Sequence, residues 1–187
     1  MALPEIKKYY TYTDYQAWDD NERWELIDGA PYAMSPAPSP AHQLLSSNLH
    51  LQFATFLKGK SCRVYYAPFD VRLNAAGDDD CDVFQPDLLV ICDRAKIDDK
   101  GCNGAPDMTI EILSQSTAIR DKVLKFNKYQ HAGVREYWII DPVDKTVLVF
   151  ILENGRYVAS SYSETDTISV HVLEGCKISL REVFSID

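Results

Sequence analysis

Two short, almost continuously apolar segments constrain the fold of this chain most. Residues 83–91 are uninterruptedly apolar after Asp87, and residues 108–113 are apolar apart from Thr109 and Glu111. Such runs are typical of strands that are buried on both faces. A sheet built from them needs a covering layer on each side, so we expect a layered α/β protein.

Two segments with helical patterns can supply these layers. Residues 39–59 begin with a Ser-Pro pair suited to the N-cap and first helical position, and they end at a glycine. Their apolar residues recur at helical spacing: Leu45, Leu49, Phe53, Phe56 and Leu57. The second segment is expected to start at a cap on Ser116 or Thr117 and to run to Ala132, before Gly133.

Further strands are predicted on both sides of these segments. Residues 64–73 are rich in Val, Tyr and Phe, and residues 136–140 read EYWII. The dipeptides Asp28-Gly29 and Asn154-Gly155 predict one β-hairpin near each end of the chain. Residues 1–187 are therefore expected to form a single domain. Its core would follow the order α-β-β-β-α-β, with helices flanking a mixed sheet and N- and C-terminal hairpins added.

Composition indicates the environment of the chain. The hydrophobic fraction of 46% is sufficient for one packed core. The first residues lack the apolar run of a signal peptide, and no segment has the pattern of a membrane span. The five cysteines are scattered without a Cys-x-x-Cys pair, so neither a disulfide framework nor a zinc ribbon is expected. A location in the reducing cytoplasm fits this pattern.

The net charge of −9 argues against strong nucleic-acid binding. Neutralisation of phosphates by Lys and Arg drives most non-specific affinity for DNA, so we expect such binding to be weak here. A local basic patch or a bound cation can still focus the field. The acidic run at residues 78–82 lacks the Gly and terminal Glu of an EF-hand, and it is expected to be a solvated loop.

The two apolar strands each carry one acid, Asp87 and Glu111. A carboxylate in a buried strand is costly unless it is paired or bound to a cation. If the strands are neighbours, the two acids converge, and their repulsion favours one proton or one divalent cation between them. Mg²⁺ keeps several waters, so two carboxylates and a backbone carbonyl suffice to hold it. Such a metal can activate water for attack on a phosphodiester.

The sequence around these acids resembles a known family. Pro86-Asp87, the spacing of 24 residues to Glu111 and the expected element order resemble the PD-(D/E)XK restriction-endonuclease superfamily. Further motifs are similar to its small standalone restriction endonucleases of the Uma-two type, and this likeness covers nearly the whole chain. The motifs are Glu25-Leu26-Ile27-Asp28-Gly29, Ser35-Pro36-Ala37-Pro38-Ser39 with His42, Ala67-Pro68-Phe69-Asp70-Val71, Gln85-Pro86-Asp87, Glu111-Ile112-Leu113-Ser114, Ser116-Thr117, Asp121 with Lys125 and Tyr129, and Ala132-Gly133-Val134-Arg135-Glu136-Tyr137-Trp138.

The resemblance implies a metal-dependent nuclease site that uses Mg²⁺ or Mn²⁺. Asp87 and Glu111 would be metal ligands together with the carbonyl of Ile112. The superfamily's lysine would stand at the position of Leu113, so the sequence departs from the general pattern there. In this subgroup the resemblance places the cation at Lys125, in the following helix.

Helical spacing alone does not select Lys125. The expected buried stripe of this helix consists of three residues, Ile119, Val123 and Phe126. Lys125 and Tyr129 lie on its flank, and Lys122 lies nearer to the stripe. Without the resemblance, Lys125 could equally be a solvated residue paired with Asp121 at i, i+4. We expect Asp121, Lys122 and Tyr129 to surround the site.

Three further residues have two readings each. Glu25 shares a strand face with Ile27, so it either supplies a third acid or lies on an exposed hairpin edge. His42, in a first helical turn, either contacts phosphate or water or makes a structural hydrogen bond. Asp70 either supports the site or forms a turn. A set of aromatic residues is expected to be core instead of stacking on bases: Tyr65, Tyr66, Tyr137 and Trp138.

The leading hypothesis is thus an endonuclease that hydrolyses nucleic-acid phosphodiester bonds, with DNA the expected substrate. The alternative is a degenerate nuclease fold that acts as a binding or regulatory module, which the acidic net charge favours. Enzymes of this fold that cut both strands often pair their sites, so a homodimer is expected, with the terminal hairpins offering free edges.

Overall fold

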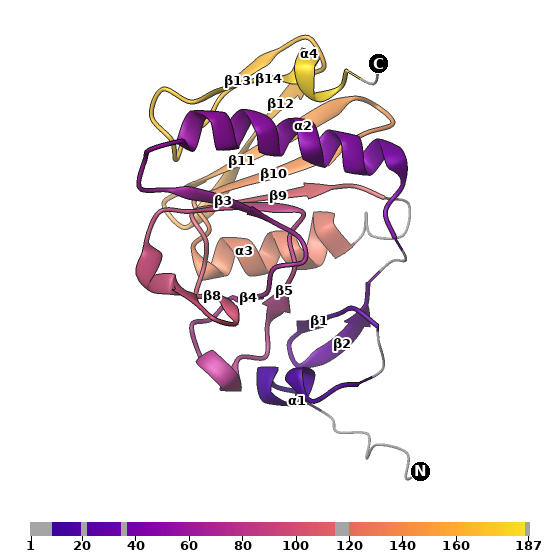
Figure 1. Ribbon diagram of the computed structural model, residues 1–187, viewed down its shortest axis with the longest axis vertical. Helices are drawn as coiled ribbons and strands as arrows, with labels where there is room; N and C mark the ends of the chain where they lie inside the picture. The colour runs from indigo at the N-terminus through magenta and orange to yellow at the C-terminus, as the bar shows by residue number, and fades with distance from the viewer. Residues whose placement is uncertain (1–8, 20–21, 35–36, 115–119, 186–187) are drawn as a thin grey trace.

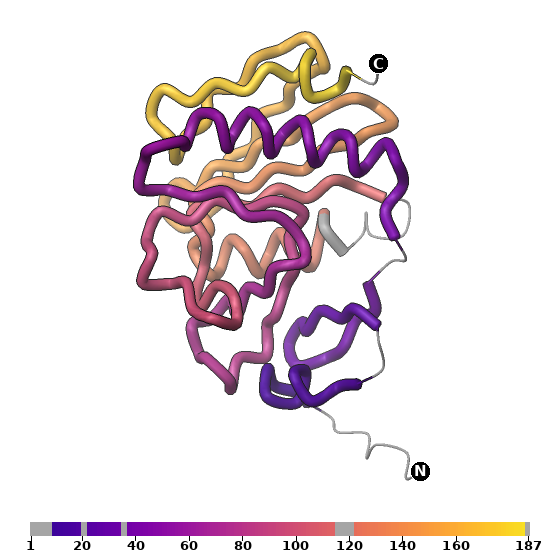
Figure 2. The backbone as a smooth tube through the Cα atoms, in the orientation of Figure 1, coloured from indigo at the N-terminus to yellow at the C-terminus, as the bar shows by residue number. Residues whose placement is uncertain are grey.

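The computed structural model describes residues 9–19, 22–34, 37–114 and 120–185 (Figures 1 and 2). Its centre is a six-stranded mixed sheet in the order β12-β11-β10-β9-β6-β3. β9 pairs in parallel with β10 and antiparallel with β6, and the outer pairs are antiparallel. The strands are Arg63–Tyr66 (β3), Leu88–Ile91 (β6), Met108–Ile112 (β9), Glu136–Asp141 (β10), Thr146–Glu153 (β11) and Arg156–Ser163 (β12).

One helix covers each face of this sheet, as the apolar strands require (Figure 1). α2 (Pro40–Leu57) buries Leu45, Leu49, Phe53 and Leu57 on one face. There the ring of Phe53 lies 5.9 Å from that of Trp138. α3 (Phe126–Ala132) buries Tyr129 against Tyr137 on the other face, with ring centroids 5.1 Å apart. The order α2-β3-β6-β9-α3-β10 confirms the expected α/β core.

The limits of the two helices follow local sequence. The hydroxyl of Ser39 accepts the N–H of His42 at 3.2 Å, which caps α2. α3 ends at Gly133, whose φ of +86° is the left-handed conformation that favours glycine. The predicted caps at Ser116 and Thr117 lie outside the described residues.

Two predicted strands are each divided between two sheets. Residues 64–73 form β3 and β4 (Val71–Arg72), and residues 83–91 form β5 (Val83–Phe84) and β6. A proline, Pro68 or Pro86, stands in each gap. Because proline has no N–H to donate to a ladder, the chain leaves one sheet there and enters the other.

The second sheet has the order β2-β1-β5-β4-β8-β7. It adds strands Trp24–Ile27 (β1), Ala30–Ala33 (β2), Ile97–Asp98 (β7) and Gly101–Asn103 (β8). β1 and β2 form the predicted N-terminal hairpin with Asp28 and Gly29 at positive φ, and β11 and β12 form the predicted hairpin at residues 154–155. Short connecting elements are α1 (Tyr12–Gln16), η1 (Gly77–Asp79) and η2 (Arg94–Lys96). β13 (Thr167–Ser169), β14 (Lys177–Ser179) and α4 (Leu180–Val183) complete the chain.

The acidic run at residues 78–82 is only partly solvated, contrary to expectation. Asp80 and Asp82 are 1% and 3% exposed. The carboxylate of Asp82 accepts the N–H of Asp28 at 2.8 Å and contacts Nζ of Lys128 at 2.9 Å. These contacts compensate the desolvation of the carboxylate and fasten the N-terminal hairpin to α3.

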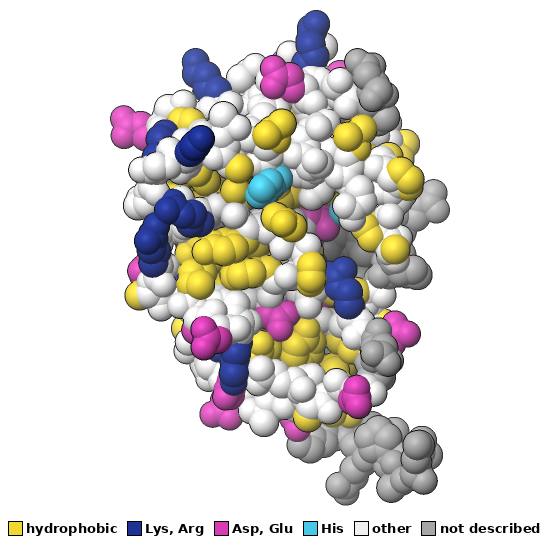
Figure 3. All heavy atoms as spheres, in the orientation of Figure 1, with side chains coloured by type: hydrophobic (Ala, Val, Ile, Leu, Met, Phe, Trp, Pro, Cys, Tyr) yellow, Lys and Arg dark blue, Asp and Glu magenta, His cyan; other side chains and the backbone are white. Residues whose placement is uncertain are grey.

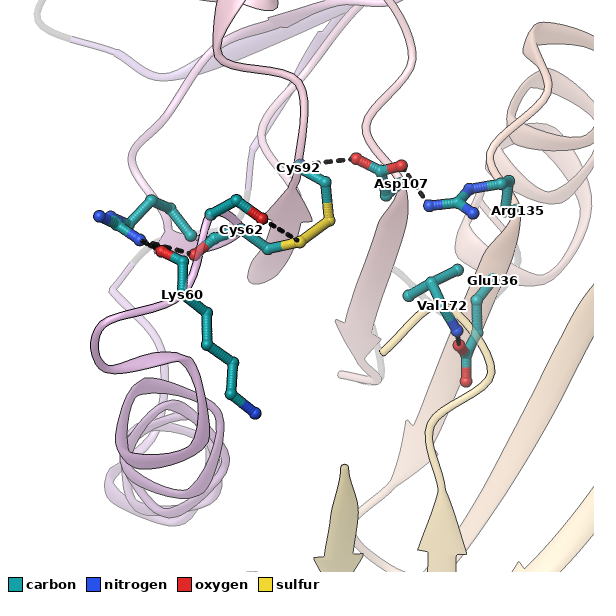
Figure 4. Close-up of a disulfide and its surroundings, with 9 residues drawn as sticks. Lys60, Cys62, Cys92, Asp107, Arg135, Glu136 and Val172 are labelled. Carbon is teal, nitrogen blue, oxygen red and sulfur yellow. Dashed lines mark hydrogen bonds and ion pairs between the residues drawn. A yellow bond between two sulfur atoms is a disulfide. The ribbon is translucent and has the colours of Figure 1, made fainter. Parts of the chain in front are cut away.

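A disulfide joins Cys62 to Cys92, contrary to the expectation of reduced cysteines (Figure 4). The pairing follows from strand register, because Arg63 lies opposite Ile91 and the next residue pair outward is Cys62 with Cys92. The bond therefore fastens edge strand β3 to β6 at the end where β3 begins. Sequence spacing of 30 residues gives no sign of this pairing.

No helix within the described ranges is long and apolar enough to cross a membrane.

Candidate active site

The register of the central sheet brings the two predicted acids together. β6 and β9 are adjacent and antiparallel, with Leu88 opposite Ile110, so one further step along the ladder sets Asp87 opposite Glu111. Glu111 is 3% exposed, whereas the side chain of Asp87, just before β6, is 22% exposed. Both lie on the sheet face that α3 covers, because side chains alternate along a strand.

Lys125 reaches this face and contacts two carboxylates. Its Nζ lies 2.9 Å from Oε1 of Glu111 and 2.9 Å from Oε1 of Glu25, and all three side chains are at most 4% exposed. The hydroxyl of Tyr129 donates to the same Glu111 oxygen at 2.9 Å. Lys125 and Tyr129 thus approach Glu111 from the same helical segment.

The buried side of this segment differs from the predicted stripe. Lys125 is 3% exposed, whereas Val123, expected in the stripe, is 51% exposed and Lys122 is exposed as well. The reason is local geometry, since Arg120–Lys125 (η3) is a π-helix whose turns are wider than those of an α-helix. The predicted buried stripe rests on the α-helical value of 3.6 residues per turn, so it does not match the buried side of this π-helical segment. Ile119 and the side chain of Asp121 lie outside the part of the chain that the structure describes.

Glu25 points into the protein, so the reading as an exposed edge residue is wrong. It lies in β1 and is 1% exposed. Besides Lys125, its Oε1 accepts the backbone N–H of Gln85 at 3.0 Å. The N-terminal hairpin therefore contributes a carboxylate to the same centre as Glu111.

Asp87 is held by backbone and by α2. Its Oδ2 accepts the N–H of Ile112 at 2.8 Å and lies 3.2 Å from Nε2 of His42. His42 occupies the first turn of α2, which places it beside the Asp87 carboxylate. The backbone of Ile112, whose carbonyl is a predicted ligand, consequently lies against Asp87.

Asp70 belongs to a neighbouring network, not to the Glu111 centre. Its carboxylate accepts the hydroxyls of Tyr12 and Tyr15 at 3.1 Å each and the side-chain amide of Gln85 at 2.8 Å. Burial, followed by the charge of Asp70, raises the pKa of both phenols well above 10, so both remain donors. Asp70 therefore supports the site indirectly, through Gln85.

Sequence reasoning missed Gln85 as a site residue. Its backbone N–H binds Glu25, and its side-chain oxygen accepts from Arg23 while its amide nitrogen reaches Tyr15 and Asp70. The available signal was its place in the Gln85-Pro86-Asp87 motif, directly before the candidate ligand. The polar side chain of Gln85 contacts Arg23 before β1, Tyr15 in α1 and Asp70 before β4, and only the tertiary structure reveals these contacts.

The donor set suits a hard divalent cation. Two carboxylates from adjacent strands and a strand-end carbonyl are oxygen ligands of the kind Mg²⁺ and Mn²⁺ prefer. Both described contacts of the Asp87 carboxylate use Oδ2. Among the described residues no three His, Cys, Asp or Glu side chains form a ready-made metal cluster, so water and backbone would complete the coordination.

Comparisons with known proteins agree with this architecture. A crystal structure titled as a "putative nuclease belonging to DUF820" from Anabaena variabilis is similar in fold, with a TM-score of 0.71 at 20% identity. The match covers 93% of this chain and 97% of that one. The uncharacterized protein slr1290 of Synechocystis sp. is 24% identical over 161 residues, 84% of this chain and 82% of its own length. A family model described as "Putative restriction endonuclease" matches residues 12–181, so the chain belongs to the Uma2 family of restriction endonuclease-like proteins.

Proposed function

We propose that this protein is a metal-dependent endonuclease that hydrolyses phosphodiester bonds of nucleic acid. The observation that supports this most is Lys125, buried between Glu25 and Glu111 on the sheet face that carries Asp87. Buried ion pairs are weak contributors to stability, and clusters of buried ionisable groups are frequent at functional sites. The Uma2 family membership supports a nuclease as the class of enzyme.

Each residue has a distinct role in this proposal. Asp87 and Glu111 would hold Mg²⁺ or Mn²⁺ with the carbonyl of Ile112, and the metal supplies a water of lowered pKa and neutralises phosphate charge. Lys125 would orient the attacking water or stabilise the developing negative charge, at a position that Glu25 fixes by its 2.9 Å contact. His42, held beside Asp87, would contact the phosphate or a water near it.

A second candidate function follows from the net charge of −9. A protein of this charge binds polyanions weakly, which favours a degenerate nuclease fold that serves as a binding or regulatory module. Such a module would retain the fold without needing the carboxylates as charged ligands.

Plasmid nicking separates the two candidates. The wild-type protein should nick supercoiled plasmid and cut single-stranded oligonucleotides at low salt with Mn²⁺, where weak phosphate binding is least penalised. Glu111→Gln, which keeps shape and removes the charge, should abolish both reactions. Glu174→Gln is the matched control, because Glu174 is exposed and lies in the C-terminal segment. Absence of cleavage by the wild type, with full retention of the fold and no shift of the melting temperature by Mn²⁺, would favour the module.

A further inference from the structure

Arg23 is an exposed cation that a neutral side chain holds in place. Its Nε donates to Oε1 of Gln85 at 3.1 Å, and its Nη2 donates to the same oxygen. The ion pairs within the described part of the chain do not include Arg23. Because these contacts use two of the five N–H groups of the guanidinium, the other donors and the positive charge remain available to a ligand.

The β1 strand places Arg23 beside the candidate active site. The carbonyl of Arg23 accepts the N–H of Met34 at 2.8 Å, so residue 23 continues the β1–β2 ladder. Alternation along the strand then puts the side chains of Arg23 and Glu25 on one face and the adjacent Glu22 on the other. Glu25 contacts Nζ of Lys125 at 2.9 Å. Arg23 therefore lies two residues farther along the strand face that fixes Lys125.

A second connection to the site runs through Gln85. Its backbone N–H binds Glu25, and its side-chain oxygen binds Arg23. Asp87 follows Gln85 by two residues, which span at most about 7 Å of extended chain. Arg23 is thus anchored to the short segment that carries the candidate metal ligand Asp87, next to the ligands but not among them.

The acid in the same network does not pair with this cation. The carboxylate of Asp70 accepts the amide of Gln85 at 2.8 Å and the hydroxyls of Tyr12 and Tyr15 at 3.1 Å each. The amide group of Gln85 therefore stands between Asp70 and Arg23. A neutral amide at this place fixes the direction of the guanidinium without cancelling its charge, as a carboxylate would.

Cations are sparse on this part of the molecule. In the lower half of the face shown in Figure 3, around the β1–β2 hairpin, Asp and Glu side chains are spread over the surface with few Lys or Arg among them. Such a surface repels a polyanion, so a cation held at the site contributes much of the local attraction. Lys125 does not fill this role, because it is buried between two carboxylates.

An exposed aromatic side chain lies outside this site. Tyr66, expected in the core, is 58% exposed, whereas Tyr137 and Trp138 are buried as predicted. The ring of Tyr66 lies 4.8 Å from that of His50, on the side of the central sheet that α2 covers. It is therefore not placed to stack on a base next to Arg23. A contact at Arg23 alone would go to the phosphate backbone, which carries no sequence information.

We propose that Arg23 binds the phosphate next to the one that is cut, and that Gln85 positions it for this contact. The planar fork of arginine matches two oxygens of one phosphate, which a lysine does not reproduce. The phosphate that is cut would lie at the metal ligands and Lys125, so Arg23, two residues farther along β1, meets its neighbour in the strand. The identity of the cut phosphate rests on the proposed function, whereas phosphate binding by Arg23 needs no cleavage.

Fluorescence anisotropy with labelled single strands in EDTA measures binding without cleavage. Arg23→Gln should raise the dissociation constant about tenfold at low salt, the scale of one hydrogen-bonded contact to a charged group. It should also flatten the plot of log K against log salt by about 0.7, the contribution of one phosphate contact in a single strand. Arg156→Gln is the matched control, because Arg156 is exposed in β12 at the edge of the central sheet and should leave both values unchanged.

Arg23→Lys separates charge from geometry. It keeps the charge and loses the planar fork, so the salt slope should stay close to that of the wild type while the dissociation constant rises less than in Arg23→Gln. Melting temperatures of the variants should match that of the wild type, because Arg23 is exposed. A loss of fold is thereby separated from a loss of binding.

Cleavage kinetics with Mn²⁺ identify which phosphate Arg23 binds. A contact to the neighbouring phosphate is the same in the ground state and the transition state, so Arg23→Gln should raise KM about tenfold and leave kcat close to that of the wild type. A contact to the cut phosphate would instead lower kcat, since charge develops there in the transition state.

Three results would overturn the proposal: no binding by the wild type at low salt, equal changes in Arg23→Gln and Arg156→Gln, or a loss confined to kcat. A wild type that binds through Arg23 and cuts nothing with Mn²⁺ leaves this phosphate site standing and removes the proposed function. Cleavage with the same KM and salt dependence in the wild type and in Arg23→Gln has the opposite meaning.

Discussion

At the scale of single residues, substitution of Lys125 separates metal binding from catalysis of cleavage. Lys125→Ala should reduce cleavage by about 10²-fold or more, the scale of losing one positioned electrostatic group, because Asp87 and Glu111 remain to hold the metal. Plasmid nicking measures the cleavage rate of the variant, and the shift in its melting temperature with Mn²⁺ measures metal binding.

Lys122→Ala is the matched control for this variant. Lys122 lies in the same π-helical segment but is exposed, so its removal should leave the rate close to that of the wild type. If Lys122→Ala is inactive while Lys125→Ala cuts normally, the segment is rotated relative to the structure described and the lysine assignment fails.

The thiols provide a second test at this scale. Cys102 and Cys176 are buried, and burial raises their pKa values to about 12 and about 11, so they remain unreactive thiols at pH 8. Cys81 is half-buried and should react. Titration with a thiol reagent should detect one cysteine in the native protein, three after denaturation and five after denaturation with reduction. Five without reduction would show that Cys62 and Cys92 are not bonded.

At the scale of elements, the disulfide should stabilise the β3–β6 pair. Cys62 and Cys92 are 30 residues apart in sequence, and closing a loop of that length in the unfolded chain stabilises by about 3–4 kcal/mol. Reduction should therefore lower the free energy of unfolding by about 3 kcal/mol, measured by denaturant titration with and without reductant. Cys62→Ser/Cys92→Ser should be as unstable as the reduced protein and insensitive to reductant; a remaining response would exclude this bond as the cause.

At the scale of the whole molecule, metal binding should raise the stability of the fold. A cation at about ten times its dissociation constant adds about 1.4 kcal/mol. For a chain of this size that corresponds to about 3–6 °C in melting temperature. Millimolar Mn²⁺ or Mg²⁺ should produce this shift in the wild type, whereas Asp87→Asn and Glu111→Gln should show none. An unmoved wild-type temperature would count against the catalytic proposal.

Assembly is the other property of the whole molecule. β2 and β12 are edge strands of their sheets, and such edges can pair with a second chain. We expect a homodimer, so light scattering should give twice the chain mass of 21.2 kDa. A mass of one chain across the micromolar range would contradict this.

The local sequence determined most of the architecture. The apolar runs around Asp87 and Glu111 implied strands that need helices on both faces, and the positions of Ser39, Gly133 and Asn154-Gly155 set helix ends and a turn. These features depend on neighbours within a few residues, so a single sequence is sufficient to predict them.

The tertiary structure decided which side chains meet. The contact of Lys125 with Glu25 joins residues 100 positions apart, and it depends on a π-helical turn that a projection with α-helical spacing does not contain. The contact of Gln85 with Glu25 and the bond between Cys62 and Cys92 likewise join residues far apart in the sequence. Sequence spacing determines which face of its own element a residue occupies. Long-range contacts arise only when strand register and helix phase are fixed by packing of the whole core.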